Sequence, residues 1–215
     1  MIKKIQILID NSKSWMNNYA KDFVQELKGY GYLCNLINDY KKVSTGDLLI
    51  LLSCENIFKK LNLNKFNIVV HESDLPLGRG WSPLTHQILE GKNEITVTLF
   101  EASETVDKGP YYLKQKISLR GNELVNEIRK KQAETTFSLI KEFLKRYPKI
   151  EKKPMIGKGT YYKKRLPKDS EIDIEKSIKK NFNLLRVVDN ERYPAFFYYK
   201  GKKFIIKIYS KQYER

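Results

Sequence analysis

The chain of 215 residues carries a formal net charge of +16, and its 41% hydrophobic and 12% aromatic residues are typical of a globular protein. This length accommodates one ordinary domain with a small appendage and excludes two large domains. No apolar run approaches the ~20 residues needed to span a bilayer, so we expect a soluble protein without a membrane partner.

The amino terminus and the cysteines favour a cytoplasmic protein. MIKKIQILID has basic residues before a short apolar run, but Asp10 and Asn11 interrupt it and no small-residue cleavage site follows. We therefore interpret it as a first strand rather than an export signal. Cys34 and Cys54 have no metal-ligand partners at useful spacing, and the chain has only two histidines, so we expect no metal site.

The first part of the chain has the pattern of an α/β protein. Residues 3–10 predict a strand, and apolar residues at helical spacing within 15–30 predict a helix that glycines end. Residues 32–37 and 47–53 predict two more strands, and 54–61 a short connecting helix. The DNSKSW segment after the first strand contains neither GxGxxG nor GxxxxGK, which disfavours a dinucleotide or P-loop phosphate site.

The middle of the chain predicts the rest of a sheet and a covering helix. Residues 66–70 are short, apolar and β-branched, as in a strand buried on both faces. Residues 84–89 predict one or two helical turns, and 94–101 and 111–119 alternate like strands that pair at one edge of the sheet. Residues 122–147 predict the longest helix, with an apolar stripe that packs on the sheet.

The last part of the chain predicts a small appended module. Residues 148–158 form a charged linker with Pro and Gly, 174–188 predict a helix, and the paired runs around Lys200-Gly201-Lys202 predict a β-hairpin. We therefore predict a main domain at 1–150 and a small α+β module at 151–215.

Positive charge is concentrated in this module. From Pro148 onward there are 19 Lys or Arg against 8 Asp or Glu, so +11 of the +16 lies in the last 68 residues. A polyanionic partner would bind there. The alternative is a lysine-rich composition spread over a solvated surface.

The stretch from Val69 to Pro83, VVHESDLPLGRGWSP, is where the sequence indicates chemistry. His71 follows the predicted buried strand, and ligands of open α/β sheets bind outside the carboxyl ends of strands. Leu75-Pro76 and Gly78-Arg79-Gly80 impose a rigid turn and then a flexible one, which suits backbone that approaches a ligand closely. By position alone, a functional histidine and a structural one bonded to nearby backbone both remain open.

This stretch resembles the signature loop of the folate-dependent formyltransferases, the family of methionyl-tRNA formyltransferase and the sugar N-formyltransferases. Downstream, TVTLFEASETVDKGPYY resembles the family's strand and loop that end in Asp-x-Gly. The resemblance implies a Rossmann-like formyltransferase domain with a mostly parallel sheet. The residues that keep the family's spacing are His71, Ser73, Leu75, Pro76, Arg79, Gly80 and Pro83 in the first motif and Asp107 and Gly109 in the second.

The resemblance also implies a reaction, the transfer of a formyl group from 10-formyltetrahydrofolate to a primary amine. His71 would act as the base or as the donor to the oxyanion, with Asp107 orienting its ring. The folate donor would be held by Ser73, Leu75, Pro76, Arg79, Gly80, Thr105 and Gly109.

One position departs from the family pattern. Val69 stands where the family has an asparagine, two residues before His71. Asn67 shares that strand face but lies roughly 13 Å from His71, because each step of two residues moves about 6.6 Å along a strand. Either another donor fills the role or the site works without it, so whether Val69 impairs activity stays open.

The module also resembles several sugar N-formyltransferases, in the segment TYYKKRLPKDSEID and in Asn190, Tyr193 and Pro194. This implies a nucleotide-linked amino sugar as the acceptor. In the signature loop, Glu72 and Asp74 would hold its ammonium group, or are simply solvated. The other substrate-binding candidates are Tyr162, Arg165, Arg192 and Tyr193.

Two alternatives to the sugar acceptor remain. tRNA is less favoured, because methionyl-tRNA formyltransferases carry a larger C-terminal β-barrel than the residues after the linker allow. The other alternative is a catalytically inactive protein that binds RNA through its basic C-terminal residues. The valine at position 69 supports this alternative, because Val69 replaces the family's asparagine. The sugar, its activating nucleotide and the oligomeric state, a homodimer included, stay open.

Overall fold

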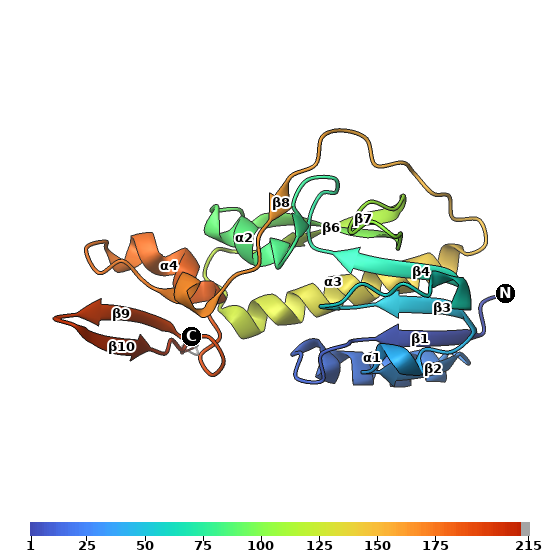
Figure 1. The fold of residues 1–215 in the computed structure, drawn as a ribbon, viewed down its shortest axis with the longest axis horizontal. Coiled ribbons are helices and arrows are strands. Elements are labelled where there is room, and N and C mark those ends of the chain that lie inside the picture. Colours follow the sequence, from blue (N-terminus) through green and yellow to red (C-terminus); the bar gives the residue numbers. More distant parts are fainter. Residues whose placement is uncertain (212–215) are drawn as a thin grey trace.

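The computed structural model of the chain describes residues 1–211 and is built around one six-stranded sheet (Figure 1). In spatial order, the first four strands run parallel to one another. The fifth strand runs antiparallel to the fourth, and the sixth runs antiparallel to the fifth. The mostly parallel sheet and the two edge strands predicted from the sequence are therefore confirmed. In spatial order the strands are β2 (Leu33–Ile37), β1 (Lys4–Leu8), β3 (Gly46–Leu51), β4 (Asn64–His71), β6 (Glu94–Glu101) and β7 (Tyr111–Ser118).

Two helices cover one face of this sheet, α1 (Met16–Gly29) and α3 (Val125–Arg146). Apolar residues recur every three or four positions in α1, and this stripe is the face that the helix buries. Phe23 of α1 stacks on Phe137 of α3 with ring centroids 4.3 Å apart, so the two helices share one core. Helix α3 begins at Val125, three residues later than predicted.

The other face is covered by an irregular segment, and the helix predicted at 54–61 is absent. The Asp10 carboxylate accepts hydrogen bonds from the backbone N–H groups of Glu55 and Asn56, each at 2.8 Å. These bonds hold the segment in a turn, and only the short 3₁₀ turn η2 (Leu61–Leu63) follows before β4. The parallel connection from β3 to β4 is thus made without a helix.

The linker after α3 is fastened to the signature loop. Strand β8 (Tyr161–Tyr162) pairs in parallel with β5 (Arg79–Gly80). The Gly78 N–H donates to the Thr160 hydroxyl at 2.8 Å, and the Arg79 N–H donates to the Thr160 carbonyl at 3.0 Å. In Figure 1 the linker is the orange trace that arches over the domain before it reaches β8.

The C-terminal module consists of the 3₁₀ turn η3 (Pro167–Ser170), helix α4 (Ile178–Val187) and a hairpin of β9 (Ala195–Tyr199) and β10 (Lys202–Ile206). The hairpin is the predicted one, and α4 begins four residues later than predicted because the Ser177 side chain caps it at the Lys180 N–H. Leu185, Val188 and Ala195 form a small core of the module's own. The division into two domains at residue 150 remains a prediction.

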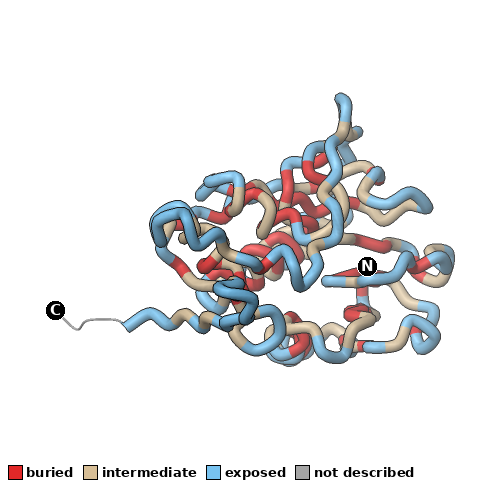
Figure 2. The backbone as a smooth tube through the Cα atoms, turned by 60° about the vertical axis from the view of Figure 1, so that its left-hand side comes forward, coloured by how far each residue is buried: buried red, intermediate tan, exposed pale blue. Residues whose placement is uncertain are grey.

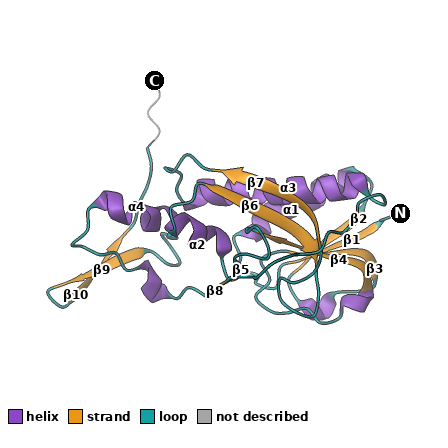
Figure 3. Ribbon diagram, turned by 90° about the horizontal axis from the view of Figure 1, so that it is seen from above, coloured by secondary structure: helices purple, strands orange, loops and turns teal. Residues whose placement is uncertain are grey.

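The module lies beside α2 (Pro83–Leu89) and the start of α3, at the end of the sheet to which the arrows of β1, β3 and β4 point (Figures 1 and 3). Buried residues are concentrated in the sheet and in the helices that cover it, and most residues of the hairpin are exposed (Figure 2). Within residues 1–211, none of the helices is both long and apolar enough to cross a membrane.

Candidate active site

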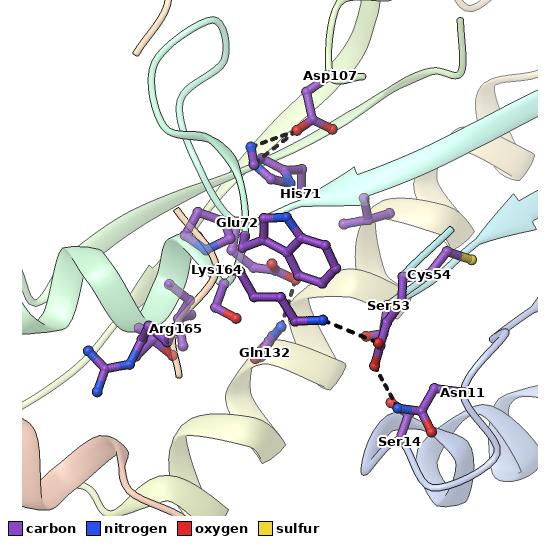
Figure 4. A pocket seen from close by; sticks show the side chains of 18 of the residues that line it. Asn11, Ser14, Ser53, Cys54, His71, Glu72, Asp107, Gln132, Lys164 and Arg165 are labelled. Carbon is purple, nitrogen blue, oxygen red and sulfur yellow. Dashed lines mark hydrogen bonds and ion pairs between the residues drawn. The ribbon is translucent and has the colours of Figure 1, made fainter. Parts of the chain in front are cut away.

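A cleft of about 710 Å³ lies at the carboxyl ends of the parallel strands, where ligands of open α/β sheets bind. It is lined from three sides, by the loops after β1 and β3, by the end of β4 with the signature loop, and by α3 with the C-terminal module. Figure 4 shows the side chains that meet there.

His71 is the last residue of β4 and is only 7% exposed. Its Nε2 lies 2.9 Å from the Gly78 carbonyl oxygen. Because a carbonyl only accepts, this contact assigns the proton of the neutral ring to Nε2 and leaves Nδ1 with the lone pair.

Asp107 lies beside His71, at a distance longer than the hydrogen bond expected from the motifs. Its Oδ2 lies 3.9 Å from His71 Nε2, longer than a hydrogen bond, and accepts the Gly80 N–H at 2.9 Å. Both side chains are about nine-tenths buried. The carboxylate therefore acts on the ring through its charge and holds the signature loop at the same time.

The loop that presents Asp107 depends on a glycine. Asp107 has a φ of +53°, in the left-handed region, and a Cβ at Gly109 would lie 1.7 Å from the Glu101 carbonyl oxygen. Only glycine permits that approach of the loop to β6.

Glu72 also lines the cleft, where it is partly buried and has no lysine or arginine partner among the described residues. The Gln132 side-chain amide donates to Glu72 Oε1 at 2.7 Å, and that of Gln87 donates to the Glu72 carbonyl at 2.7 Å (Figure 4). Removal from water raises the pKa of the Glu72 carboxyl, and the neighbouring His71 acts in the opposite direction.

Asp74, predicted to act with Glu72, is exposed and lies outside the cleft lining. Its carboxylate pairs with Lys114 of β7 at 2.5 Å. The prediction that the two carboxylates act together is therefore wrong in geometry, because the chain turns sharply after His71.

The predicted folate-binding residues divide into two groups. Gly80 and Thr105 line the cleft. The others lie behind the lining and build the loop: the carbonyl of Ser73 accepts from the Thr98 hydroxyl at 2.7 Å, and Leu75 is 1% exposed. The remaining members of this second group are Pro76, Arg79 and Gly109.

In the C-terminal module, Arg165, Arg192 and Tyr193 line the cleft as predicted. Arg165 donates to the Asp169 carbonyl at 2.6 Å, and removal from water lowers the pKa of its guanidinium. Arg192 donates to the Lys13 carbonyl at 3.1 Å, which ties the module to the loop after β1.

Tyr162 points away from the cleft, contrary to the prediction, and Tyr161 lines it instead. The Tyr162 ring stacks on His86 with centroids 4.5 Å apart, and its hydroxyl donates to Glu90 at 2.7 Å. Burial and this bond raise the pKa of Tyr162 to about 12. Successive residues of a strand face opposite sides, so a difference of one position decides which tyrosine reaches the cleft.

Sequence reasoning missed several lining residues. Trp81 follows Gly80 in the signature loop, and its position there was the available signal. Lys164 Nζ lies 4.1 Å from the Trp81 ring centroid and 3.6 Å from the Glu55 carboxylate across the cleft. Gln132 of α3 gave no signal, because the helix face that reaches the cleft is set by packing.

Comparison with known proteins gives relatives of one kind, although no protein-family model matches the chain. It is 29% identical over 144 residues to methionyl-tRNA formyltransferase of Thermosipho melanesiensis, which covers 66% of this chain and 47% of the relative. It is 28% identical over 206 residues to the bifunctional polymyxin resistance protein ArnA of Wigglesworthia glossinidia brevipalpis, which covers 87% and 28%. The chain thus spans half or less of the length of these relatives.

Solved structures agree with the sequence relatives. Methionyl-tRNA formyltransferase from Clostridium thermocellum superposes with a TM-score of 0.82 at 22% identity, covering 99% of this chain and 94% of that one. A sugar N-formyltransferase from a Shewanella species gives 0.71 at 17%, covering 99% of both. HypX from Aquifex aeolicus in complex with tetrahydrofolic acid gives 0.78 at 17%, covering 97% and 38%. The chain is similar in sequence to the formyltransferases and shares their fold, which confirms the resemblance that its two motifs carry.

Proposed function

We propose that the chain is an N-formyltransferase that moves a formyl group from 10-formyltetrahydrofolate to a primary amine. The observation that carries this proposal is the pairing of His71 and Asp107 in a cleft at the carboxyl end of β4. HypX, which shares this fold, was solved with tetrahydrofolic acid. The cleft volume of about 710 Å³ suits a ligand of that size, and Gly80 and Thr105 are the lining residues placed to hold it.

The geometry supports a specific role for His71 in this proposal. With Nε2–H bonded to the Gly78 carbonyl, Nδ1 is the atom that accepts a proton from the amine. Asp107, 3.9 Å from Nε2, stabilises the imidazolium that forms, in the manner of the carboxylate in a catalytic triad. The bound donor supplies the formyl carbon that the amine attacks.

A nucleotide-linked amino sugar is the acceptor that the lining supports best. Arg165 and Arg192 bring guanidinium groups to the cleft, whose planar fork suits a diphosphate. Tyr161 and Tyr193 bring aromatic rings on which a base can stack. These groups share one cleft with His71, so an amine linked to such a nucleotide lies within reach of the base.

tRNA is the second candidate. The net charge of +16 favours a polyanion, and the chain is 29% identical over 144 residues to a methionyl-tRNA formyltransferase. If tRNA is the substrate, the lysines of the C-terminal module contact its phosphates, and the cleft residues do not bind a nucleotide.

One experiment separates these possibilities. Purified protein is mixed with 10-formyltetrahydrofolate and either methionyl-tRNA or a panel of nucleotide-linked 4-amino sugars, and formylation is followed by mass spectrometry, with His71→Ala as the control. We expect one amino sugar to gain a formyl group with the wild type only. Formylation of tRNA alone, with steeply salt-dependent binding, would overturn the sugar proposal. Absence of both products would leave the inactive binding protein.

A further inference from the structure

Glu72 is an acidic side chain of the cleft that the mechanism does not use and that, among the described residues, has no basic side chain within ion-pair distance, whereas Asp107 lies 3.9 Å from His71 Nε2. Among the acidic side chains that line the cleft, Glu55 lies 3.6 Å from Lys164, and Asp189 lies 2.9 Å from Arg129. For Glu72, within residues 1–211, the structure shows an amide partner, Gln132, and no lysine or arginine within ion-pair distance.

The lysine and arginine side chains that line the cleft also have partners other than Glu72. Lys164 and Arg129 hold Glu55 and Asp189, and the other two arginines donate to backbone carbonyls, Arg165 to Asp169 and Arg192 to Lys13. A partly buried carboxylate without a cation is costly in free energy, and a positively charged ligand offsets that cost. The cleft therefore contains a ready site for a cation beside Glu72.

The position of this site relative to the base is fixed by the fold. Glu72 follows His71 directly, and both side chains line the cleft although strand neighbours usually diverge, because β4 ends at His71. Gln132 on α3 fixes the Glu72 carboxylate from the opposite wall, and Gln87 of α2 holds its backbone carbonyl. Figure 4 shows Glu72 between the labelled His71 and Gln132.

We propose that Glu72, held in place by Gln132, binds the ammonium form of the acceptor amine and takes its first proton. This inference rests on the proposed function and extends it to the recognition of the amine. It gives Glu72 direct contact with the substrate and makes Gln132 a positioning residue.

Two proton acceptors balance the reaction. The acceptor nitrogen begins as –NH₃⁺ and ends as the –NH– of a formamide, so it loses two protons. The first passes to the Glu72 carboxylate and later to water. The neutral amine then uses its lone pair to form the C–N bond to the formyl carbon, while the carbonyl π electrons move to oxygen. The second proton passes through His71 to N10 of the donor. The oxyanion lone pair re-forms the C=O bond as the C–N10 bond breaks, and the electron pair of that bond stays on N10.

The electrostatics of the site agree with this assignment. Removal from water raises the pKa of Glu72, the charge of His71 lowers it, and the charge of Asp107 raises it again. A carboxylate whose pKa is raised is a better base for an ammonium ion than an exposed one.

The test is a binding comparison that does not require turnover. By titration calorimetry, each nucleotide-linked amino sugar of the panel is compared with its analogue in which a hydroxyl replaces the amine. For wild type we expect at least tenfold tighter binding of the amine. Glu72→Gln, which keeps the shape and removes the charge, should reduce this preference to less than twofold without changing the affinity for tetrahydrofolate.

Controls separate recognition from folding. Glu134→Gln makes the same change at an exposed position of α3 and should leave the preference intact. Gln132→Leu should weaken the preference in the wild type and have no further effect in Glu72→Gln. An equal affinity of wild type for amine and hydroxyl analogues, or an unchanged preference in Glu72→Gln, overturns the inference. Failure of the proposed function shows separately, as absence of formylated product when amine binding is intact.

Discussion

Val69 lines the cleft two residues before His71, at the position where the family motif has an asparagine. Asn67 does not replace it, because its amide donates to the Leu61 carbonyl at 2.8 Å, before the start of β4. The cleft does contain a side-chain amide, that of Gln132, which comes from α3. The cleft thus has a side-chain amide on another element, and this amide donates to Glu72.

From this we expect that Val69→Asn changes turnover by less than about threefold, since the cleft already has an amide donor. Steady-state formylation rates with saturating donor measure this. A gain of tenfold or more would show that the wild-type site is impaired by Val69.

His71 and Asp107 carry the second expectation at this scale. His71→Ala removes the proton acceptor and Asp107→Asn removes the charge 3.9 Å from Nε2, so each should lower turnover by about a hundredfold or more. Circular dichroism should show an unchanged fold. Near-normal turnover in either variant would remove that residue from the mechanism.

At the scale of elements, helix α4 is fixed to the main domain by a buried ion pair. Arg186 is 1% exposed and lies 3.2 Å from Glu123, and its Nε donates to the Glu123 carbonyl at 3.1 Å. Glu123 also accepts the Arg120 N–H at 2.8 Å and pairs with Lys131 at 3.0 Å. The pair therefore joins the C-terminal module to the start of α3.

The surroundings of Glu123 predict that the free energy of unfolding falls at low pH. Burial acts to raise the pKa of Glu123, but hydrogen bonds from Arg120 and Lys131 outweigh it and hold the pKa at about 2, against 4.5 for an ordinary glutamate. The folded state thus binds fewer protons than the unfolded state between these values, so stability falls as the pH drops through that window. The expected loss is about 3 kcal/mol.

Urea unfolding at a series of pH values from 6 to 2.5 tests this expectation. Glu123→Gln should flatten the pH dependence. Arg186→Met should destabilise the protein by about 1–3 kcal/mol at neutral pH, because it removes the buried guanidinium and leaves the Glu123 carboxylate only Lys131 and two backbone N–H groups as partners. Glu142→Gln, which breaks an exposed pair with Arg146, is the matched control and should behave as wild type. An acid profile of Glu123→Gln identical to that of wild type would contradict this assignment.

At the scale of the whole molecule, the cleft is formed between parts of the chain that are far apart in sequence. The loop after β1 and the C-terminal module meet where Arg192 donates to the Lys13 carbonyl, 179 positions away. The linker, fixed to the signature loop through Thr160, brings the module to this position. Acceptor recognition should therefore depend on the module and donor recognition on the main domain.

Accordingly, we expect Arg165→Ala and Tyr193→Ala to raise the KM for the nucleotide-linked sugar about tenfold or more, while the Kd for tetrahydrofolate stays within twofold. Fluorescence titration of folate binding provides the internal control. If the KM for the sugar and the Kd for tetrahydrofolate rose equally, these residues would stabilise the cleft as a whole and would not recognise the acceptor.

The sequence by itself determined the features that follow from local periodicity. Alternation and apolar runs located the six sheet strands, and helical spacing located α1 and α3, because side-chain direction repeats every 2.0 and 3.6 residues regardless of context. The two motifs, through their resemblance to the formyltransferases, also predicted His71 and Asp107 as a pair, and the two side chains lie 3.9 Å apart.

Tertiary structure decided the rest, because it depends on contacts between distant positions. The Asp10 carboxylate kept residues 54–61 from forming a helix, and the pairing of β8 with β5 sent Tyr161 rather than Tyr162 into the cleft. Glu72 and Gln132 are 60 positions apart, and no local pattern specifies which face of α3 meets the end of β4. Packing of α3 on the sheet places that amide, and the chemistry of the cleft follows from it.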